Sequence, residues 1–140
     1  MLTMSNRNNQ YDQYKTQNVM TASPGELTLM LYDGCLRNMK LGKMHISDKL
    51  YEKANDVLQK AQAIMTELIS SLDLSYEISN QILPLYVYIN EQILNANIRK
   101  DCSALDSPIE LIAEFRDTWQ QAIKQSRIQM YGGAGIPANG

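Results

Sequence analysis

The chain has 140 residues, of which 44% are hydrophobic, and this is enough for one domain with its own hydrophobic core. Its 13 basic and 15 acidic residues are scattered and give a net charge of -2, which argues against a nucleic-acid-binding protein. The longest uncharged run, residues 78–90, is shorter than the roughly 20 apolar residues of a transmembrane helix. Residues 1–10 are polar and lack the apolar centre of a signal peptide, so we expect a cytoplasmic protein with no membrane insertion and two reduced cysteines.

Two tyrosines precede the first predicted helix, in a polar segment. Tyr11 and Tyr14 are three residues apart, which places both rings on one side of a helical turn. A helix this short is not stable alone, so the rings would need a groove in which to dock. One interpretation is that residues 1–20 form a lid that covers an apolar groove when no partner is bound. The other is a disordered tail with two incidental tyrosines.

The first helix is predicted over residues 23–44. Ser23 suits the N-cap, Pro24 suits the first helical position, and Glu26 can complete a capping box. Apolar residues then occupy two faces of this helix: Leu27, Met30, Leu31 and Gly34 on one, and Leu29, Tyr32, Leu36 and Met39 on the other. A helix with two apolar faces must be buried on two sides, and a partner can provide one of them.

The second helix is predicted over residues 48–72, because apolar residues recur there in steps of three and four. Residues 73–75 form a short loop, and Ser75 is the expected N-cap of a third helix over residues 76–99.

Two features of the third helix need an explanation. Pro84 removes one backbone hydrogen bond, so we expect a kink at residues 80–83 or two shorter helices that meet there. Tyr86 and Tyr88 lie about 200° apart around a helix, and therefore cannot both face the same core.

The fourth helix is predicted to begin at the sequence Ser107-Pro108-Ile109-Glu110, which repeats the capping pattern of the first, and to end near residue 131. We expect Trp119 to be buried in it. The glycine-rich residues 132–140 should be a disordered tail, because glycine is costly to order. Four helices of about 20 residues with short loops predict an all-α, antiparallel up-down four-helix bundle over residues 21–131, with a short N-terminal segment packed on it.

The residues offer little for catalysis. Di-iron bundles need Glu-x-x-His on two helices, whereas the single histidine, His45, has Gly42 three residues before it. Ser23 is better explained as a helix cap than as a nucleophile, and glycines 132–135 follow a helix rather than opening one. We therefore predict a protein that is not an enzyme and needs no cofactor or metal, with His45 at a solvated helix end.

An ordered set of short motifs resembles the FliS family of flagellar secretion chaperones. The motifs are TASPGEL at residues 21–27, MLYDG at 30–34 and KAQAI at 60–64, followed by Leu85-Tyr86, Tyr88-Ile89, Asn97 and Trp119. The resemblance covers about residues 11 to 125. Two features depart from the family pattern: Pro84 stands where a helix former is usual, and the loop after Asp73 lacks a glycine.

The resemblance implies a cytoplasmic bundle that binds the disordered C-terminal segment of flagellin and prevents its premature polymerisation. It also implies delivery to the cytoplasmic domain of a membrane export-gate protein, and an anti-sigma factor or co-chaperone as a further partner. On this basis we predict the partner-binding residues Tyr11, Tyr14, Leu68, Leu72, Tyr86, Tyr88, Ile89 and Leu94. The alternative is a regulatory adaptor of the same architecture that binds an anti-sigma factor or another flagellar protein. A metal-dependent bundle enzyme is a third reading, which the missing histidines argue against.

Overall fold

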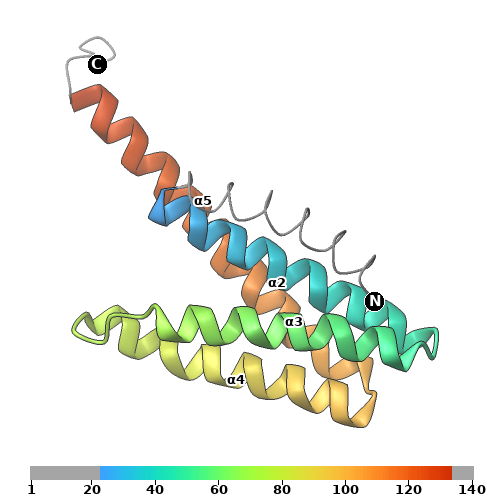
Figure 1. Cartoon of the computed structure of the whole chain (residues 1–140). Coiled ribbons are helices and arrows are strands. Elements are labelled where there is room, and N and C mark those ends of the chain that lie inside the picture. Colours follow the sequence, from blue (N-terminus) through green and yellow to red (C-terminus); the bar gives the residue numbers. More distant parts are fainter. Residues whose placement is uncertain (1–22, 134–140) are drawn as a thin grey trace, which may run out of the picture.

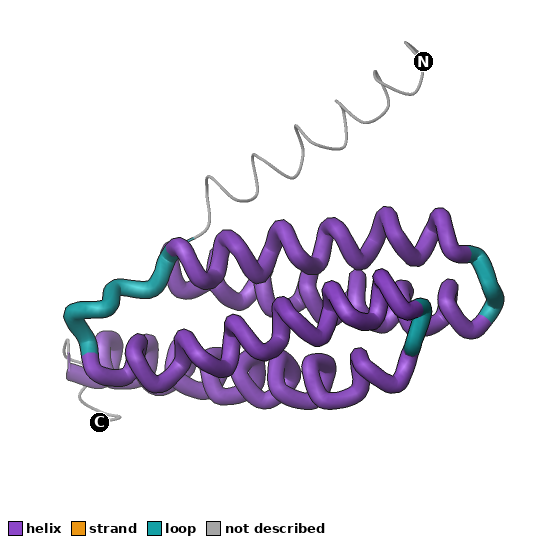
Figure 2. Tube along the Cα trace, turned by 90° about the horizontal axis from the view of Figure 1, so that it is seen from below, coloured by secondary structure: helices purple, strands orange, loops and turns teal. Residues whose placement is uncertain are grey.

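The structure is a computed structural model that describes residues 23–133. Four long helices follow one another along the chain, namely α2 (Pro24–Ser47), α3 (Tyr51–Ser70), α4 (Glu77–Arg99) and α5 (Asp106–Gly133), with a 3-10 helix, η1 (Cys102–Leu105), before α5 (Figure 1). The view turned by 90° shows the helices running side by side, with the loops at the two ends of the bundle (Figure 2). The prediction of an all-α, antiparallel four-helix bundle is therefore confirmed.

The start of α2 has the predicted N-cap and first-turn proline, but no hydrogen bond from the Ser23 N–H to the Glu26 carboxylate completes the capping box. Ser23 is the N-cap and its Oγ accepts a hydrogen bond from the backbone N–H of Glu26 at 3.2 Å, with Pro24 at the first helical position. The Glu26 carboxylate forms an ion pair with Arg127 on α5. The same short sequence thus begins one helix and ties it to another.

The loop before α4 differs from the prediction. The α4 N-cap is Tyr76, which makes no side-chain cap hydrogen bond, so the prediction of Ser75 as the cap is wrong. Asp73 instead accepts hydrogen bonds from the backbone N–H and the hydroxyl of Ser75, at 3.0 and 2.6 Å. This Asx turn holds Ser75 within the loop.

The α4 helix continues through Pro84, so the alternative of two shorter helices is wrong. Pro84 cannot donate a hydrogen bond to the carbonyl of Asn80. Both residues are exposed, so water can bond to that carbonyl and the helix can tolerate the loss.

The start of α5 also differs from the prediction. Helix η1 leads directly into α5, which begins at Asp106, so Ser107 is already helical and is not the N-cap. The Ser107 hydroxyl instead shares a hydrogen bond with the Tyr88 hydroxyl at 2.9 Å. At its other end α5 extends through Gly133, two residues into the predicted tail.

The core lies where α2, α3, α4, η1 and the first half of α5 meet. Its largest fully buried side chains are Cys35, Met39, Leu58, Met65, Leu68, Ile89, Ile93, Leu105, Pro108 and Ile112. Removing this apolar surface from water is the main force that holds the helices together.

Two further predictions about single residues are wrong. Trp119 is 37% exposed rather than buried, because it lies at the middle of α5, beyond the core and beside the start of α2. Its indole Nε1–H donates to the carbonyl of Gly25 at 2.8 Å. His45 does lie in the last turn of α2, but it is half-buried and its Nδ1 atom is shielded from solvent without a hydrogen-bond partner among the described residues.

Candidate partner-binding surface

The most apolar exposed surface of the described chain belongs to α4. This helix carries six exposed large hydrophobic side chains, more than any other element: Ile78, Leu85, Val87, Tyr88, Leu94 and Ile98. Glu91 is the one charged residue between positions 78 and 98. Isolated apolar residues are common on protein surfaces, but a helix with this many exposed apolar side chains and so little charge is typical of an interaction surface.

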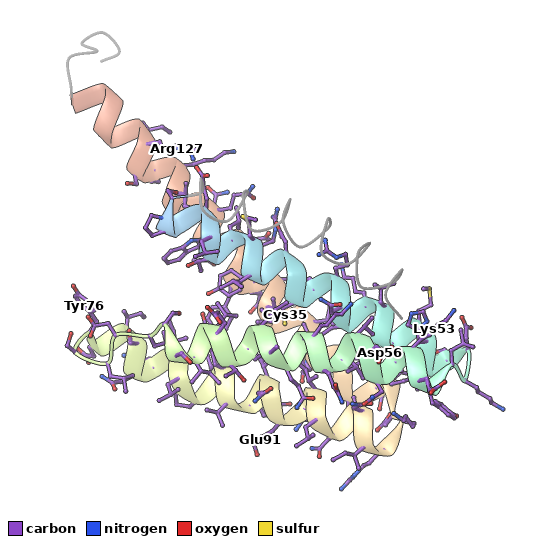
Figure 3. The ribbon with its side chains drawn as sticks, viewed as in Figure 1. Cys35, Lys53, Asp56, Tyr76, Glu91 and Arg127 are labelled. Atoms are coloured by element: carbon purple, nitrogen blue, oxygen red, sulfur yellow. The ribbon has the colours of Figure 1, made fainter. Side chains whose placement is uncertain are left out.

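These side chains divide between two sides of α4. Leu85 and Tyr88 face α5, since Leu85 lines a hollow between the helices and Tyr88 bonds to Ser107 at the start of α5. Successive residues of a helix are rotated by about 100°, which turns the stripe formed by Pro84, Val87, Glu91, Leu94 and Ile98 away from this side. We call these five residues the outer stripe, and Figure 3 shows Glu91 pointing away from the other helices.

The hollow between α4 and α5 has a volume of about 250 Å³. It is lined by Leu85 from α4 and by Leu111, Glu114, Phe115 and Thr118 from α5. We call it the α4–α5 groove. It is smaller than most small-molecule sites, but it is concave and largely apolar, which suits an apolar side chain presented by a helical partner.

Phe115, which lines the α4–α5 groove, belongs to an aromatic cluster. The ring of Phe115 stacks on Tyr32 with centroids 6.1 Å apart, and meets Tyr86 edge to face at 5.3 Å. The hydroxyls of Tyr32 and Tyr86 are joined by a buried hydrogen bond of 2.5 Å. The cluster therefore connects α2, α4 and α5 next to the groove.

Burial sets the protonation of this cluster. It raises the pKa of Tyr32 above its ordinary value, although the hydrogen bond from Tyr86 acts in the opposite direction. It also raises the pKa of Tyr86, and here the bond to Tyr32 adds to the effect. Both hydroxyls therefore stay protonated at neutral pH and can maintain the bond that links α2 to α4.

Six of the eight predicted binding residues lie in the described part of the chain, and they differ in burial. Leu68, Tyr86 and Ile89 lie in the core, where they support the surface from below and are not accessible to a partner in this conformation. Leu72 is half-buried. Tyr88 and Leu94 are exposed, but Tyr88 faces the α4–α5 groove and Leu94 belongs to the outer stripe. Tyr11 and Tyr14 lie outside the described residues.

Sequence reasoning missed several residues of this surface, namely Leu85, Leu111 and Phe115 in the groove and Val87 and Ile98 on the outer stripe. A signal was present, because residues 78–98 carry one charge and apolar residues around most of the helix. It did not indicate which apolar side packs inward.

A second hollow of about 630 Å³ lies over α2 and α5. Its lining mixes the apolar Leu36, Leu41, Met44 and Ala113 with the charged Asp33, Arg37, Lys40, Arg116 and Asp117. Arg116 forms ion pairs with both Asp33 and Asp117. This hollow is larger but more polar than the α4–α5 groove.

The described residues contain no group of three or more His, Cys, Asp or Glu that could hold a metal ion. No helix among them is long and apolar enough to cross a membrane. Cys35 and Cys102 are both free thiols, and burial raises the pKa of Cys35 to about 12. A thiol with so high a pKa is unreactive at neutral pH.

Comparison with known proteins decides the family. The sequence model of the family "Flagellar protein FliS" matches residues 7–126. The chain belongs to the FliS family. The flagellar secretion chaperone FliS of Bacillus subtilis (strain 168) is 39% identical over 128 residues, which cover 91% of this chain and 96% of that protein. The FliS of Escherichia coli (strain K12) is 31% identical over 108 residues, covering 75% and 79% of the two chains.

A solved structure shows the same fold. The crystal structure of a bacterial flagellar chaperone superimposes with a TM-score of 0.68 and 18% identity, covering 84% of this chain and 97% of that one. The FliS relatives are named as chaperones rather than as enzymes. The chain is therefore a flagellar chaperone of the FliS family, built as a four-helix bundle.

Proposed function

We propose that this FliS-family protein binds the disordered C-terminal segment of flagellin in the cytoplasm through the α4–α5 groove. By covering the apolar face of that segment it prevents premature polymerisation, and it then delivers the subunit to the cytoplasmic domain of the export gate. The observation that carries the proposal is the apolar, charge-poor groove side of α4, with Leu85 and Tyr88 exposed beside Leu111 and Phe115 of α5.

The groove suits an amphipathic helix rather than a rigid protein surface. A helix can place one apolar side chain against Leu85 and Phe115, and others further along α4 beside Tyr88 and Ile78. Ordering a disordered segment costs binding free energy, so the client must bury a large apolar area. The exposed length of α4 supplies such an area, and the buried hydrogen bond between Tyr32 and Tyr86 ties α4 to α2 beside Phe115.

Isothermal titration calorimetry with a peptide of the last ~40–50 residues of the same organism's flagellin tests the proposal, since this length provides several helical turns. We expect tight binding with a large negative heat-capacity change, the mark of apolar burial. Leu85→Asp should weaken binding by at least about tenfold, because it places a charge in the groove. Ile128→Asp, at an exposed position near the far end of α5, is the matched control and should bind like the wild type.

A soluble peptide that does not bind the wild-type protein would overturn the proposal and favour a regulatory adaptor with an anti-sigma factor or another flagellar protein as partner. Equal binding by Leu85→Asp and the wild type would show that flagellin uses another surface.

A further inference from the structure

The outer stripe of α4 forms a second apolar surface, separate from the α4–α5 groove. Val87, Leu94 and Ile98 follow one another in steps of seven and four residues, which keeps them in line, and they are 41%, 43% and 69% exposed. Pro84 extends the line by one turn, so the stripe is about 21 Å long. This length matches a partner helix of about four turns.

Glu91 lies at the centre of the stripe, with two of its members before it and two after it. Its side chain points into solvent, away from the other helices (Figure 3), and no salt bridge to it exists among the described residues. The stripe is thus an apolar surface with a single negative charge at its middle, which no cation of residues 23–128 pairs with.

This central charge argues against a second copy of the chain as the occupant. In a twofold-symmetric pair of antiparallel α4 helices centred on the stripe, Pro84 would face Ile98 of the copy and Val87 would face Leu94. Glu91 would then face its own symmetry mate, and two like charges would be enclosed by apolar side chains. Such a pairing is electrostatically unfavourable.

We propose that the outer stripe binds an amphipathic helix of a partner protein that carries a lysine or arginine opposite Glu91. The apolar residues of that helix cover Val87, Leu94 and Ile98, and its cation neutralises the Glu91 carboxylate as water is excluded. The charge pair contributes selectivity, because a helix with an acidic residue at this place meets repulsion. The stripe and the α4–α5 groove are on different sides of α4, so both can be occupied at once.

The test uses the full-length chain and two designed helical peptides of about 18 residues, long enough to cover the stripe. Both carry leucines in steps of three and four, and they differ only in a central lysine or glutamate. Fluorescence anisotropy measures the affinity of each for the wild type, Glu91→Lys and Leu94→Asp. Glu110→Lys is the control, since it makes the same charge change at an exposed position on α5. Circular dichroism confirms that each variant is folded.

We expect the lysine peptide to bind the wild type and Glu110→Lys alike, and to lose at least about tenfold in affinity for Glu91→Lys. The glutamate peptide should show the reverse preference, and Leu94→Asp should bind neither peptide. Affinities that do not depend on the charges of peptide and protein would overturn the proposal. So would a dimer in sedimentation equilibrium that Leu94→Asp dissociates, because the occupant would then be a second copy.

The flagellin peptide described above separates this proposal from the proposed function. If Glu91→Lys and Leu94→Asp weaken flagellin binding as much as Leu85→Asp does, the stripe belongs to the flagellin site and a separate partner is excluded. If flagellin does not bind the wild type while the peptide charge swap behaves as expected, the proposed function fails and the stripe remains a docking surface.

Discussion

At the scale of single residues, Gly42 marks a close approach between α2 and α3. A Cβ atom at this position would lie 2.4 Å from Cδ2 and 2.8 Å from Cγ of Leu58, which is fully buried. We predict that Gly42→Ala lowers the free energy of unfolding by about 1–2 kcal/mol, because overpacking outweighs the roughly 1 kcal/mol by which alanine favours a helix. Urea denaturation measures this change.

Gly25→Ala is the matched control for that experiment. A Cβ atom there meets Ile123 at an ordinary 3.4 Å, so this variant should be as stable as the wild type or slightly more stable. A Gly42→Ala protein as stable as Gly25→Ala would show that Leu58 can move aside without cost.

The buried hydroxyls of Tyr32 and Tyr86 and the thiol of Cys35 make stability sensitive to alkaline pH. Burial raises the pKa of all three groups, that of Cys35 to about 12. A group with a higher pKa in the folded state stabilises the fold below its unfolded pKa and loses that contribution as the pH rises. The free energy of unfolding should therefore begin to fall at about pH 8.5, where unfolded cysteine ionises, and fall more steeply above about pH 10, where unfolded tyrosine ionises.

Urea denaturation between about pH 8 and about pH 11 measures this dependence. The double variant Tyr32→Phe with Tyr86→Phe removes two of the titrating groups and should lose stability less steeply as the pH rises. Tyr76→Phe, at an exposed position, should follow the wild type. Parallel curves for the double variant and the wild type would contradict the role of the tyrosine pair.

At the scale of helices, Pro84 is a local defect in α4. It lies well inside an uninterrupted helix and is exposed, so its ring contributes little to the core. We predict that Pro84→Ala raises the free energy of unfolding by about 1–3 kcal/mol, because alanine restores the hydrogen bond to Asn80 and removes a steric clash. Thermal and urea denaturation measure the gain. Pro24→Ala, at the first position of α2, is the control and should change stability by less than about 0.5 kcal/mol. A loss of stability in Pro84→Ala would mean that α4 requires the proline.

The helices could be predicted from the sequence because apolar periodicity and capping are local signals. Local signals gave a wrong helix start where a neighbouring helical element leads directly into the helix. Ser23 has an extended backbone and caps α2 as predicted, whereas the similar Ser107 follows η1 and is already part of the α5 helix. The N-cap before this continuous helical stretch is Asp101, at the start of η1, whose carboxylate accepts a hydrogen bond from the backbone N–H of Ser103 at 3.0 Å.

The binding surface was less predictable, because apolar residues on both sides of α4 do not show which side packs in the core. The spacing of Tyr86 and Tyr88 correctly separated them into a buried and an exposed residue, at 3% and 41% exposure. It could not say which of them is buried, since both sides of α4 are apolar. Leu68 of α3 and Ile89 of α4 were also predicted to bind a partner, but the packing of α3 against α4 puts both in the core.

At the scale of the whole molecule, the position of α5 creates the α4–α5 groove. The first half of α5 contributes Ile112 to the core, whereas its second half runs past the start of α2 (Figure 1). Two exposed contacts hold α5 against the start of α2 from its middle onward: the hydrogen bond from Trp119 to Gly25 and the ion pair between Arg127 and Glu26. Exposed ion pairs contribute little to stability, so this part of α5 is held less firmly than its first half. The bundle is therefore closed between α2, α3 and α4 and open between α4 and the far part of α5.

This architecture allows the N-terminal segment to be tested as a lid. The buried core runs from Tyr32 to Ile112, so deleting residues 1–16 should leave a bundle that unfolds cooperatively in thermal denaturation. If Tyr11 and Tyr14 cover the α4–α5 groove in the free protein, as we propose, the deletion exposes apolar surface and raises the fluorescence of an apolar dye. Leu85→Asp in the shortened protein should lower that fluorescence again, whereas Ile128→Asp should not. Unchanged dye binding after the deletion would exclude a lid, and a fluorescence rise insensitive to Leu85→Asp would place the lid on another part of the surface.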